Sequence, residues 1–241
     1  MNRPTLAAIA LLGLLTAAGP AGAIVWQKGA EPQKVQEGEM KNAGKLLYSP
    51  LRVLGGSCVA LGGRWALTSR HGTDEWKPEM LAVSFPAISD AVYRVKAVHF
   101  PAAGDLALLE LDKKVDGAAE LELDTVEDRT GKRAWLGGFG FSGEAGSIGG
   151  AKGFVGGFNR VEAYRKGKLS IRLSKEGEGE TPEVLPARMD SGSPLFVEVE
   201  GKWRLAGIAS TVTNSRNPGT GDWGNYTRIS PVEGWIRKLT K

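Results

Sequence analysis

The sequence is poor in cysteine and lacks any long hydrophobic run after its N-terminal region. Its 241 residues include one cysteine, Cys58, and two histidines. A single thiol excludes an internal disulfide, so the fold must rest on its hydrophobic core. No later stretch reaches the length of a membrane-spanning helix. Lysine and arginine are scattered along the chain, and without a basic stripe or a known motif we expect no nucleic-acid binding.

The N-terminal region has the pattern of a secretory signal peptide. Arg3 supplies a positive charge, residues 6–18 form a short apolar run, and residues 21–23 (AGA) fit the small-residue cleavage rule. Cleavage there would leave a mature chain that begins at Ile24. We therefore expect a signal peptide over residues 1–23, a secreted or periplasmic location, and no membrane attachment after its removal.

Glycine is abundant, with 34 residues, which favours the many tight turns of an all-β protein. Residues 57–68 indicate a strand, a turn and a second strand, and Cys58 is expected to be a buried core residue of the first. Residues 161–164 and 169–173 predict another hairpin. The charged, glycine-broken stretch 112–133 suits a connection between two halves.

The motif around which the chain is organised is MDSGSP, residues 189–194, with an apolar run directly after it. It resembles the GDSGGP nucleophile loop of the trypsin-like serine proteases, which have the chymotrypsin fold. The resemblance implies that Ser191 is the nucleophile and that the backbone N–H groups of Met189 and Ser191 form the oxyanion hole. Met189 stands where the family has glycine, and Ser193 replaces a second glycine.

Two upstream segments resemble the motifs that carry the other members of the family's catalytic triad. Residues 64–71 (RWALTSRH) are similar to the family's RWVLTAAH, which implies that His71 is the general base. Residues 105–109 (DLALL) are similar to DIALL, which implies that Asp105 orients the histidine. An acid at the start of a buried strand is otherwise costly unless it is paired. The order histidine, aspartate, serine is the chymotrypsin order.

The resemblance covers nearly the whole mature chain and implies its fold. We expect an all-β protein with two six-stranded antiparallel Greek-key barrels and a short C-terminal helix, in the manner of a bacterial-type secreted member without disulfides. The peptidase domain would span residues 24–241. Its parts would be an N-terminal barrel over about 24–120, a C-terminal barrel over about 132–230, and the helix over 231–240.

The resemblance also implies a substrate pocket and an activating contact. Counting from the motifs assigns the pocket to four residues: Leu185, Ser210, Val212 and Gly224. No acid stands where trypsin carries one, and Val212 replaces a glycine that opens trypsin's pocket, so we expect small or medium apolar residues before the scissile bond. In the family an N-terminal isoleucine pairs with the acid before the serine, which here implies the pair Ile24 and Asp190. Removal of the signal peptide would itself create that terminus.

Two weaker patterns are interpreted as structural. Residues 138–143 spell G-x-G-x-x-G, but no helical pattern follows, and a dinucleotide site needs a strand, a turn and a helix. Residues 175–183 carry four glutamates among glycines, which indicates a solvated loop rather than a cation site. We therefore expect neither a cofactor nor a metal ion.

The sequence thus predicts a secreted serine endopeptidase that acts on protein or peptide substrates as a monomer, through a triad and an acyl-enzyme. One alternative is a catalytically impaired homologue that acts as a binding protein, which Met189 and the bulky Arg70 before His71 favour. Another is a carbohydrate- or polyanion-binding β protein, and the basic pI of about 9.1 is the only feature that supports it. The complete triad favours the endopeptidase.

Overall fold

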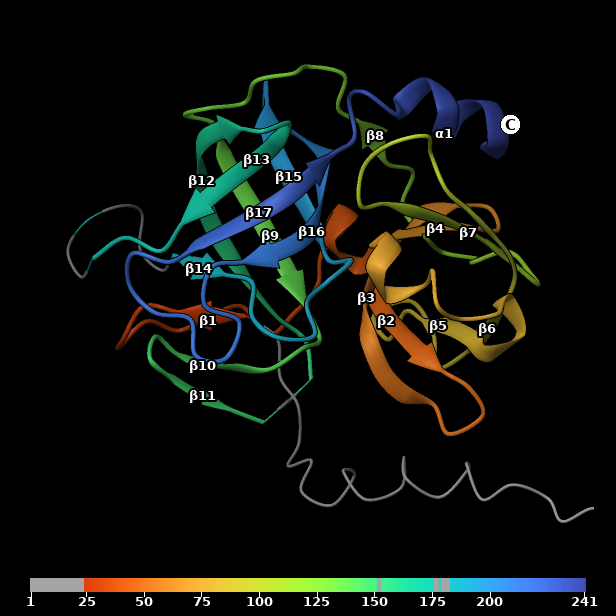
Figure 1. The fold of residues 1–241 in the computed structure, drawn as a ribbon, viewed down its shortest axis with the longest axis horizontal. Coiled ribbons are helices and arrows are strands. Elements are labelled where there is room, and N and C mark those ends of the chain that lie inside the picture. Colours follow the sequence, from red (N-terminus) through yellow and green to blue (C-terminus); the bar gives the residue numbers. More distant parts are fainter. Residues whose placement is uncertain (1–23, 151–152, 176–177, 179–182) are drawn as a thin grey trace, which may run out of the picture.

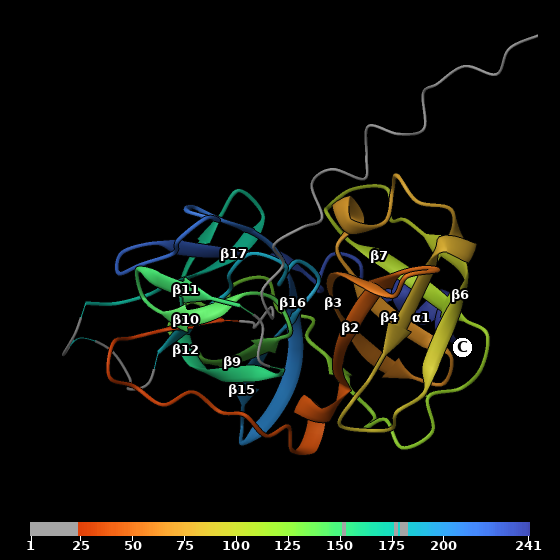
Figure 2. The ribbon, with the colours of Figure 1, turned by 90° about the horizontal axis from the view of Figure 1, so that it is seen from below.

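The computed structural model of the chain describes residues 24–150, 153–175, 178 and 183–241. The expected signal peptide lies outside the described residues. Two β-barrels lie side by side, and helix α1 (Glu233–Thr240) ends the chain beside the first of them (Figure 1). The view from below shows the same two barrels side by side (Figure 2). No helix in the described ranges is long and apolar enough to cross a membrane.

The first barrel is closed by six strands in the order β2-β3-β4-β7-β6-β5, with every neighbouring pair antiparallel. The strands are β2 (Ala43–Tyr48), β3 (Val53–Gly62), β4 (Trp65–Thr68), β5 (Leu81–Ser84), β6 (Val92–His99) and β7 (Ala107–Leu111). Cys58 is fully buried in β3, and burial raises the pKa of its thiol, so it is an inert core residue.

The second barrel has the order β15-β9-β12-β13-β17-β16, and pairing of β15 with β16 closes it. The strands are β9 (Arg133–Gly138), β12 (Val155–Arg165), β13 (Lys168–Arg172), β15 (Pro194–Val199), β16 (Lys202–Val212) and β17 (Trp223–Arg228), and β8 (Glu122–Leu123) joins β16 at its outer edge. Counted along the chain, both barrels have the same circular strand order, 1-2-3-6-5-4. The predicted pair of six-stranded Greek-key barrels is confirmed.

A small sheet beside the second barrel holds the start of the described chain. Its order is β11-β10-β1-β14, built from β1 (Val25–Trp26), β10 (Ser142–Glu144), β11 (Ser147–Gly149) and β14 (Val184–Leu185). The strands of the first barrel begin only at Ala43, whereas the expected N-terminal barrel began at about residue 24. Residues 25–26 instead pair with strands of the second half, because Val25 lies between Gly143 and Leu185.

Burial on both faces explains why several strands are almost continuously apolar. In β7, Leu109 and Leu111 pack inside the first barrel, while Leu108 points the other way into a cluster that joins the two halves. In β15, Leu195 packs inside the second barrel and Phe196 enters the same joining cluster. Because successive strand residues point to opposite faces, both faces of these strands must be apolar. The two barrels are therefore joined by a continuous apolar core.

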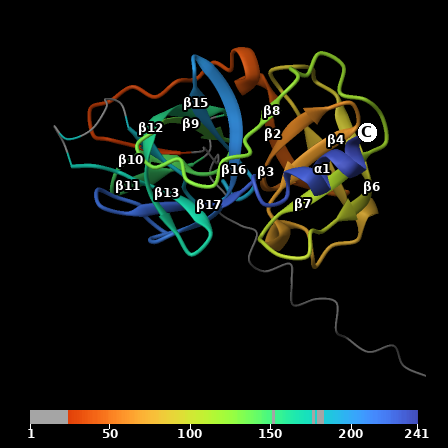
Figure 3. The same cartoon turned by 90° about the horizontal axis from the view of Figure 1, so that it is seen from above.

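The remaining elements are short. The 3-10 helices are η1 (Gly38–Asn42), η2 (Arg70–Gly72) and η3 (Pro78–Met80). Helix α1 begins two residues after the predicted start and buries Ile236 in the cluster that joins the halves. Its basic residues lie in the last turn, where the helix dipole favours them. Seen from above, α1 lies over the first barrel near β7 (Figure 3).

Candidate active site

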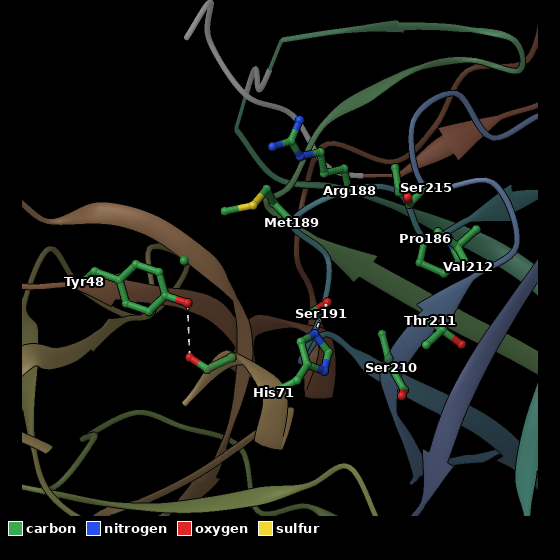
Figure 4. Close-up of a pocket in the computed structure, with 14 residues that line it drawn as sticks. Tyr48, His71, Pro186, Arg188, Met189, Ser191, Ser210, Thr211, Val212 and Ser215 are labelled. Carbon is green, nitrogen blue, oxygen red and sulfur yellow. Dashed lines mark hydrogen bonds between the residues drawn. The ribbon is translucent and has the colours of Figure 1, made fainter. Parts of the chain in front are cut away.

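The three residues of the predicted triad come from three connections between strands and meet where the two barrels face each other. His71 lies in η2 directly after β4, Asp105 lies just before β7, and Ser191 lies between β14 and β15. His71 Nδ1 is 2.8 Å from Asp105 Oδ2, and His71 Nε2 is 2.8 Å from Ser191 Oγ. The structure thus brings together the three side chains that the motifs singled out. Figure 4 shows two of them, His71 and Ser191, facing each other.

Asp105 is held by three donors. Its Oδ1 accepts the backbone N–H of His71 at 3.0 Å, and its Oδ2 accepts the His71 ring at 2.8 Å and the Ser210 hydroxyl at 2.6 Å. Burial alone would raise the pKa of Asp105, but the hydrogen bonds from His71 and Ser210 outweigh it and lower the pKa to about 2. Asp105 is therefore a carboxylate at neutral pH and acts only as an acceptor.

The charge on Asp105 determines which ring nitrogen of His71 carries the proton. A carboxylate can only accept, so Nδ1 must be the protonated nitrogen of the neutral imidazole, which leaves Nε2 as the acceptor that faces the Ser191 hydroxyl. The hydrogen bond to Asp105 raises the pKa of His71. The arrangement can therefore take a proton from Ser191 and hold it as an imidazolium.

The loop that carries Ser191 is anchored to the first barrel. The backbone N–H of Ser57 donates to the Ser191 carbonyl at 2.8 Å, and the Thr68 hydroxyl donates to the Ser57 carbonyl at 2.7 Å. Gly192 has φ +90°, and a Cβ at that position would overlap the carbonyl oxygen of Ser57. Only glycine fits there, which explains the glycine of the motif in terms of packing.

Asp190 is fully buried and binds the start of the described chain. Its Oδ2 accepts the N–H groups of Ile24 at 2.9 Å and Ala187 at 2.8 Å, and its Oδ1 accepts the N–H of Gly140 at 3.1 Å. Burial raises the pKa of Asp190 to about 7, against the opposing effect of these three donors. Ile24, also fully buried, therefore lies where the predicted pair requires it.

Met189 adopts the backbone conformation that its glycine counterpart would favour. Its φ is +70°, in the left-handed region, which costs a residue with a side chain about 1 kcal/mol. The N–H groups of Met189 and Ser191 donate to no protein acceptor within the described ranges. Both donors are therefore available to the oxygen of a bound carbonyl.

Gly140 fixes the position of this loop, and a methyl group there should displace it. A Cβ at Gly140 would overlap the carbonyl oxygen of Arg188 and lie 2.6 Å from the carbonyl carbon of Met189. We expect Gly140→Ala to destabilise the protein by about 2–3 kcal/mol through overpacking. We also expect it to lower kcat about 10²-fold, because the Met189 donor would move. Urea denaturation and steady-state kinetics measure the two effects.

Gly149→Ala is the matched control for that substitution. A Cβ at Gly149 would meet nothing closer than the Ser142 carbonyl oxygen at 3.7 Å, which is an ordinary contact. The control should change kcat by less than twofold. Wild-type kcat in Gly140→Ala would contradict the assignment of Met189 to the oxyanion hole.

A cleft of about 430 Å³ runs past the triad between the barrels. The first barrel lines it with Tyr48, Gly55, His71 and Gly72. Figure 4 labels two of these, Tyr48 and His71. The second barrel contributes a larger set: Pro186, Ala187, Arg188, Met189, Ser191, Ala209, Ser210, Thr211, Val212 and Ser215. The walls beyond Ser191 are therefore made mostly of small or apolar side chains, and none of the lining residues is acidic.

Two of the four predicted pocket residues lie elsewhere. Ser210 and Val212 line the cleft, whereas Leu185 is fully buried in the core of the second barrel and Gly224 is covered by Pro186, so neither of these two is among the lining residues. Leu185 pairs with Val25 in the small sheet, which turns its side chain inward. Pro186 then covers Gly224, since a Cβ there would lie 2.7 Å from the proline ring. Pro186 and Ala187 line the cleft in place of Leu185 and Gly224.

Sequence reasoning missed one of the contacts that hold Asp105. Ser210 was expected to contact substrate, but its hydroxyl also donates to Asp105. The one available signal was the acid at the start of a buried strand, which needs partners.

Arg70, whose bulk next to His71 favoured an impaired site, stacks its guanidinium 4.8 Å from the Phe100 ring centre and pairs with Asp74. Its side chain therefore has partners outside the triad.

The acidic stretch 175–183 lies partly outside the described residues, which omit 176–177 and 179–182. Within it, Glu183 is buried and its carboxylate accepts the backbone N–H of Ser174 at 2.8 Å. In the part of the chain that the structure describes, no three histidine, cysteine or acidic side chains converge as a metal site.

Comparison with known proteins agrees with this architecture. No family model matches the sequence. The fold is similar to the solved structure of neuropsin, described as a serine protease expressed in the limbic system of mouse brain, with a TM-score of 0.68 and 17% sequence identity. The match covers 88% of this chain and 99% of that chain. The chain therefore has the chymotrypsin fold of the trypsin-like serine proteases.

Proposed function

We propose that the protein is a serine endopeptidase that hydrolyses peptide bonds through an acyl-enzyme on Ser191. The observation that carries this proposal is the continuous hydrogen-bonded chain from Ser191 Oγ through His71 to Asp105, with both links at 2.8 Å. The N–H groups of Met189 and Ser191, which have no acceptor among the described residues, and the cleft next to them support the same chemistry. The fold that this chain shares with neuropsin is compatible with it.

In the acylation step, Ser191 Oγ attacks the carbonyl carbon of the scissile bond while His71 Nε2 takes the hydroxyl proton. The carbonyl oxygen becomes an oxyanion, which accepts the N–H groups of Met189 and Ser191. The Asp105 carboxylate stabilises the imidazolium that has formed. His71 then gives its proton to the leaving amine, the C–N bond breaks, and the acyl group stays on Ser191 as an ester.

Deacylation repeats these steps with water. His71 Nε2 takes a proton from a water molecule whose oxygen attacks the ester carbon. The same two N–H donors stabilise the second oxyanion. The ester bond to Ser191 Oγ then breaks, His71 returns its proton to Ser191, and the carboxylic acid product leaves.

For specificity we propose small or medium apolar residues before the scissile bond. Pro186, Ala187 and Val212 give the cleft an apolar lining beyond Ser191, and no carboxylate is present there to bind a lysine or arginine side chain. Arg188 lies at the same wall but its guanidinium stacks 5.4 Å from the Phe141 ring centre. A long basic side chain would therefore find no partner in the cleft.

A peptide-library cleavage profile tests this proposal. We expect cleavage after alanine, valine or leucine to be favoured over cleavage after lysine or arginine by at least about 100-fold in kcat/KM, because a buried unpaired charge is costly. Val212→Gly, which removes side-chain bulk from the wall, should shift the preference toward larger residues. Preferred cleavage after basic or acidic residues would contradict the assignment.

We also propose that the protein is exported, to the periplasm or the medium, and acts as a monomer on protein or peptide substrates. The signal-peptide pattern predicts a mature N-terminus at Ile24, and the contact of Ile24 N with Asp190 supports that start. Cleavage of the signal peptide would then place an ammonium group against a buried carboxylate. No separate activation step is needed in this scheme.

A further inference from the structure

Lys168 places a positively charged side chain next to Ser210, whose hydroxyl contacts Asp105. It is the first residue of β13, directly after the tight turn at Lys166 and Gly167, and its Nζ donates to Ser210 Oγ at 2.9 Å. Lys168 is partly buried, and within the described residues no carboxylate lies at ion-pair distance, 4.0 Å or less, from its Nζ. Its ammonium group is thus directed to the hydroxyl that contacts Asp105 instead of to an acid of its own.

The donor and acceptor rules fix the direction of every hydrogen bond in this array. An ammonium group has only donors, so Ser210 Oγ must accept from Lys168. The single hydroxyl proton of Ser210 is then free to donate to Asp105 Oδ2 at 2.6 Å. The same carboxylate oxygen accepts the His71 ring at 2.8 Å. The array runs without interruption from Lys168 to the triad.

We propose that Lys168 is a positioning residue for the Asp105–His71 pair and acts on it through Ser210. The proposal rests on the endopeptidase function put forward above. In this proposal Lys168 has two effects. It orients the Ser210 hydroxyl and so holds the Asp105 carboxylate in place. It also adds a positive charge that offsets the negative charge of Asp105 as felt by His71.

The charged groups around His71 support the second effect. The hydrogen bond and charge of Asp105 and the charge of Asp74 raise the pKa of the imidazole, whereas burial and, to a smaller extent, the charge of Lys168 lower it. Arg70, the adjacent cation, is paired with Asp74 and stacked on Phe100. Lys168 is therefore the cation that opposes the two carboxylates.

The test uses the titration of His71, which does not depend on activity. The chain has only two histidines, so the ring signals of His71 are identified by their loss in His71→Gln. In a Ser191→Ala background we expect Lys168→Met to raise the pKa of His71, measured by NMR over pH 4–9. Lys168→Arg, which keeps the charge, should leave the titration closer to that of the parent.

Lys166→Asn is the matched control. Lys166 lies two residues away in the same turn, is exposed, and has φ +48°, which asparagine tolerates. In the described part of the chain its side chain makes no hydrogen bond to the triad, so its loss should leave the pKa of His71 unchanged. Equal titration of His71 in the parent and in Lys168→Met would overturn the proposal, and so would an equal rise in Lys166→Asn.

Kinetics gives a second readout. In the chain with Ser191 intact, we expect Lys168→Met to lower kcat about tenfold, the factor associated with one hydrogen bond to a charged group, with KM little changed. The acid limb of the pH profile should move to higher pH. A lower kcat with an unmoved pH profile would show a merely structural role. If no Ser191-dependent hydrolysis were found, the endopeptidase proposal would fail. The proposal for Lys168 would still be tested, because the His71 titration does not require activity.

Discussion

Replacing Ser191 or His71 by alanine should lower kcat/KM on the best library peptide by about 10⁵–10⁶-fold, and replacing both should cost no more than either alone. The two groups act as one unit: without His71 no base takes the serine proton, and without Ser191 there is no acyl-enzyme. Asp105→Asn should cost about 10⁴-fold, because an amide can donate to Nδ1 and so favours the wrong tautomer of His71. Purified variants with wild-type circular dichroism give the measurement.

Ser193→Ala is the control for these substitutions. Ser193 lies two residues after Ser191, is fully buried, and its hydroxyl has no hydrogen-bond partner in the described part of the chain. Its removal should therefore change kcat/KM by less than about threefold and leave stability the same or higher. Losses that add up in the Ser191 and His71 double variant would mean that the two residues act independently, contrary to the triad.

Proteins that begin at Ile24 and at Ala23 should differ in how their stability depends on pH. Where Ile24 N is an amide, the pKa of Asp190 is about 7 in the folded state against 3.8 when it is unfolded and exposed. A raised carboxyl pKa stabilises the fold at low pH, and that stability is lost as pH rises from about 4 through about 7. The loss is on the order of 4 kcal/mol for this fully buried group.

A free Ile24 ammonium should remove most of this loss, because an opposite charge favours the ionised carboxylate and lowers the pKa of Asp190. Urea unfolding at pH 5 and pH 7.5 measures the difference. Asp190→Asn in the form that keeps Ala23 is the control, since it lacks the titrating group and should show little pH dependence. Equal pH dependence in both forms would contradict the ion pair. N-terminal sequencing of the exported protein should find Ile24, and another start would contradict the cleavage scheme.

Short motifs were sufficient to predict the fold and the residues that meet in the triad. The serine loop, the strand ending at His71 and the strand beginning after Asp105 each carry local constraints that are visible in sequence. The glycine at 192 is one such constraint, because a side chain there would overlap Ser57. Continuous apolar runs such as β7 were visible as well, although their reason, burial on two faces, emerged only from the packing.

The parts that could not be predicted depend on contacts between distant segments. Leu185 was placed in the cleft by counting, but pairing of β14 with β1 joins residues about 160 positions apart and turns this side chain into the core. The same pairing draws residues 25–26 to the second half. Lys168 and Ser210 are 42 positions apart, on strands β13 and β16. No local pattern marks such a contact, because the two strands do not pair with each other and lie near each other only as the two neighbours of β17.

The most direct test of the central claim, that Ser191 is a nucleophile activated by His71, is labelling with a fluorophosphonate followed by mass spectrometry of the tryptic peptides. We expect a single phosphonyl adduct on Ser191, a rate that rises with pH as His71 loses its proton, and no adduct in Ser191→Ala or His71→Ala. Absence of an adduct on Ser191 in the folded protein, or equal labelling of His71→Ala, would contradict it.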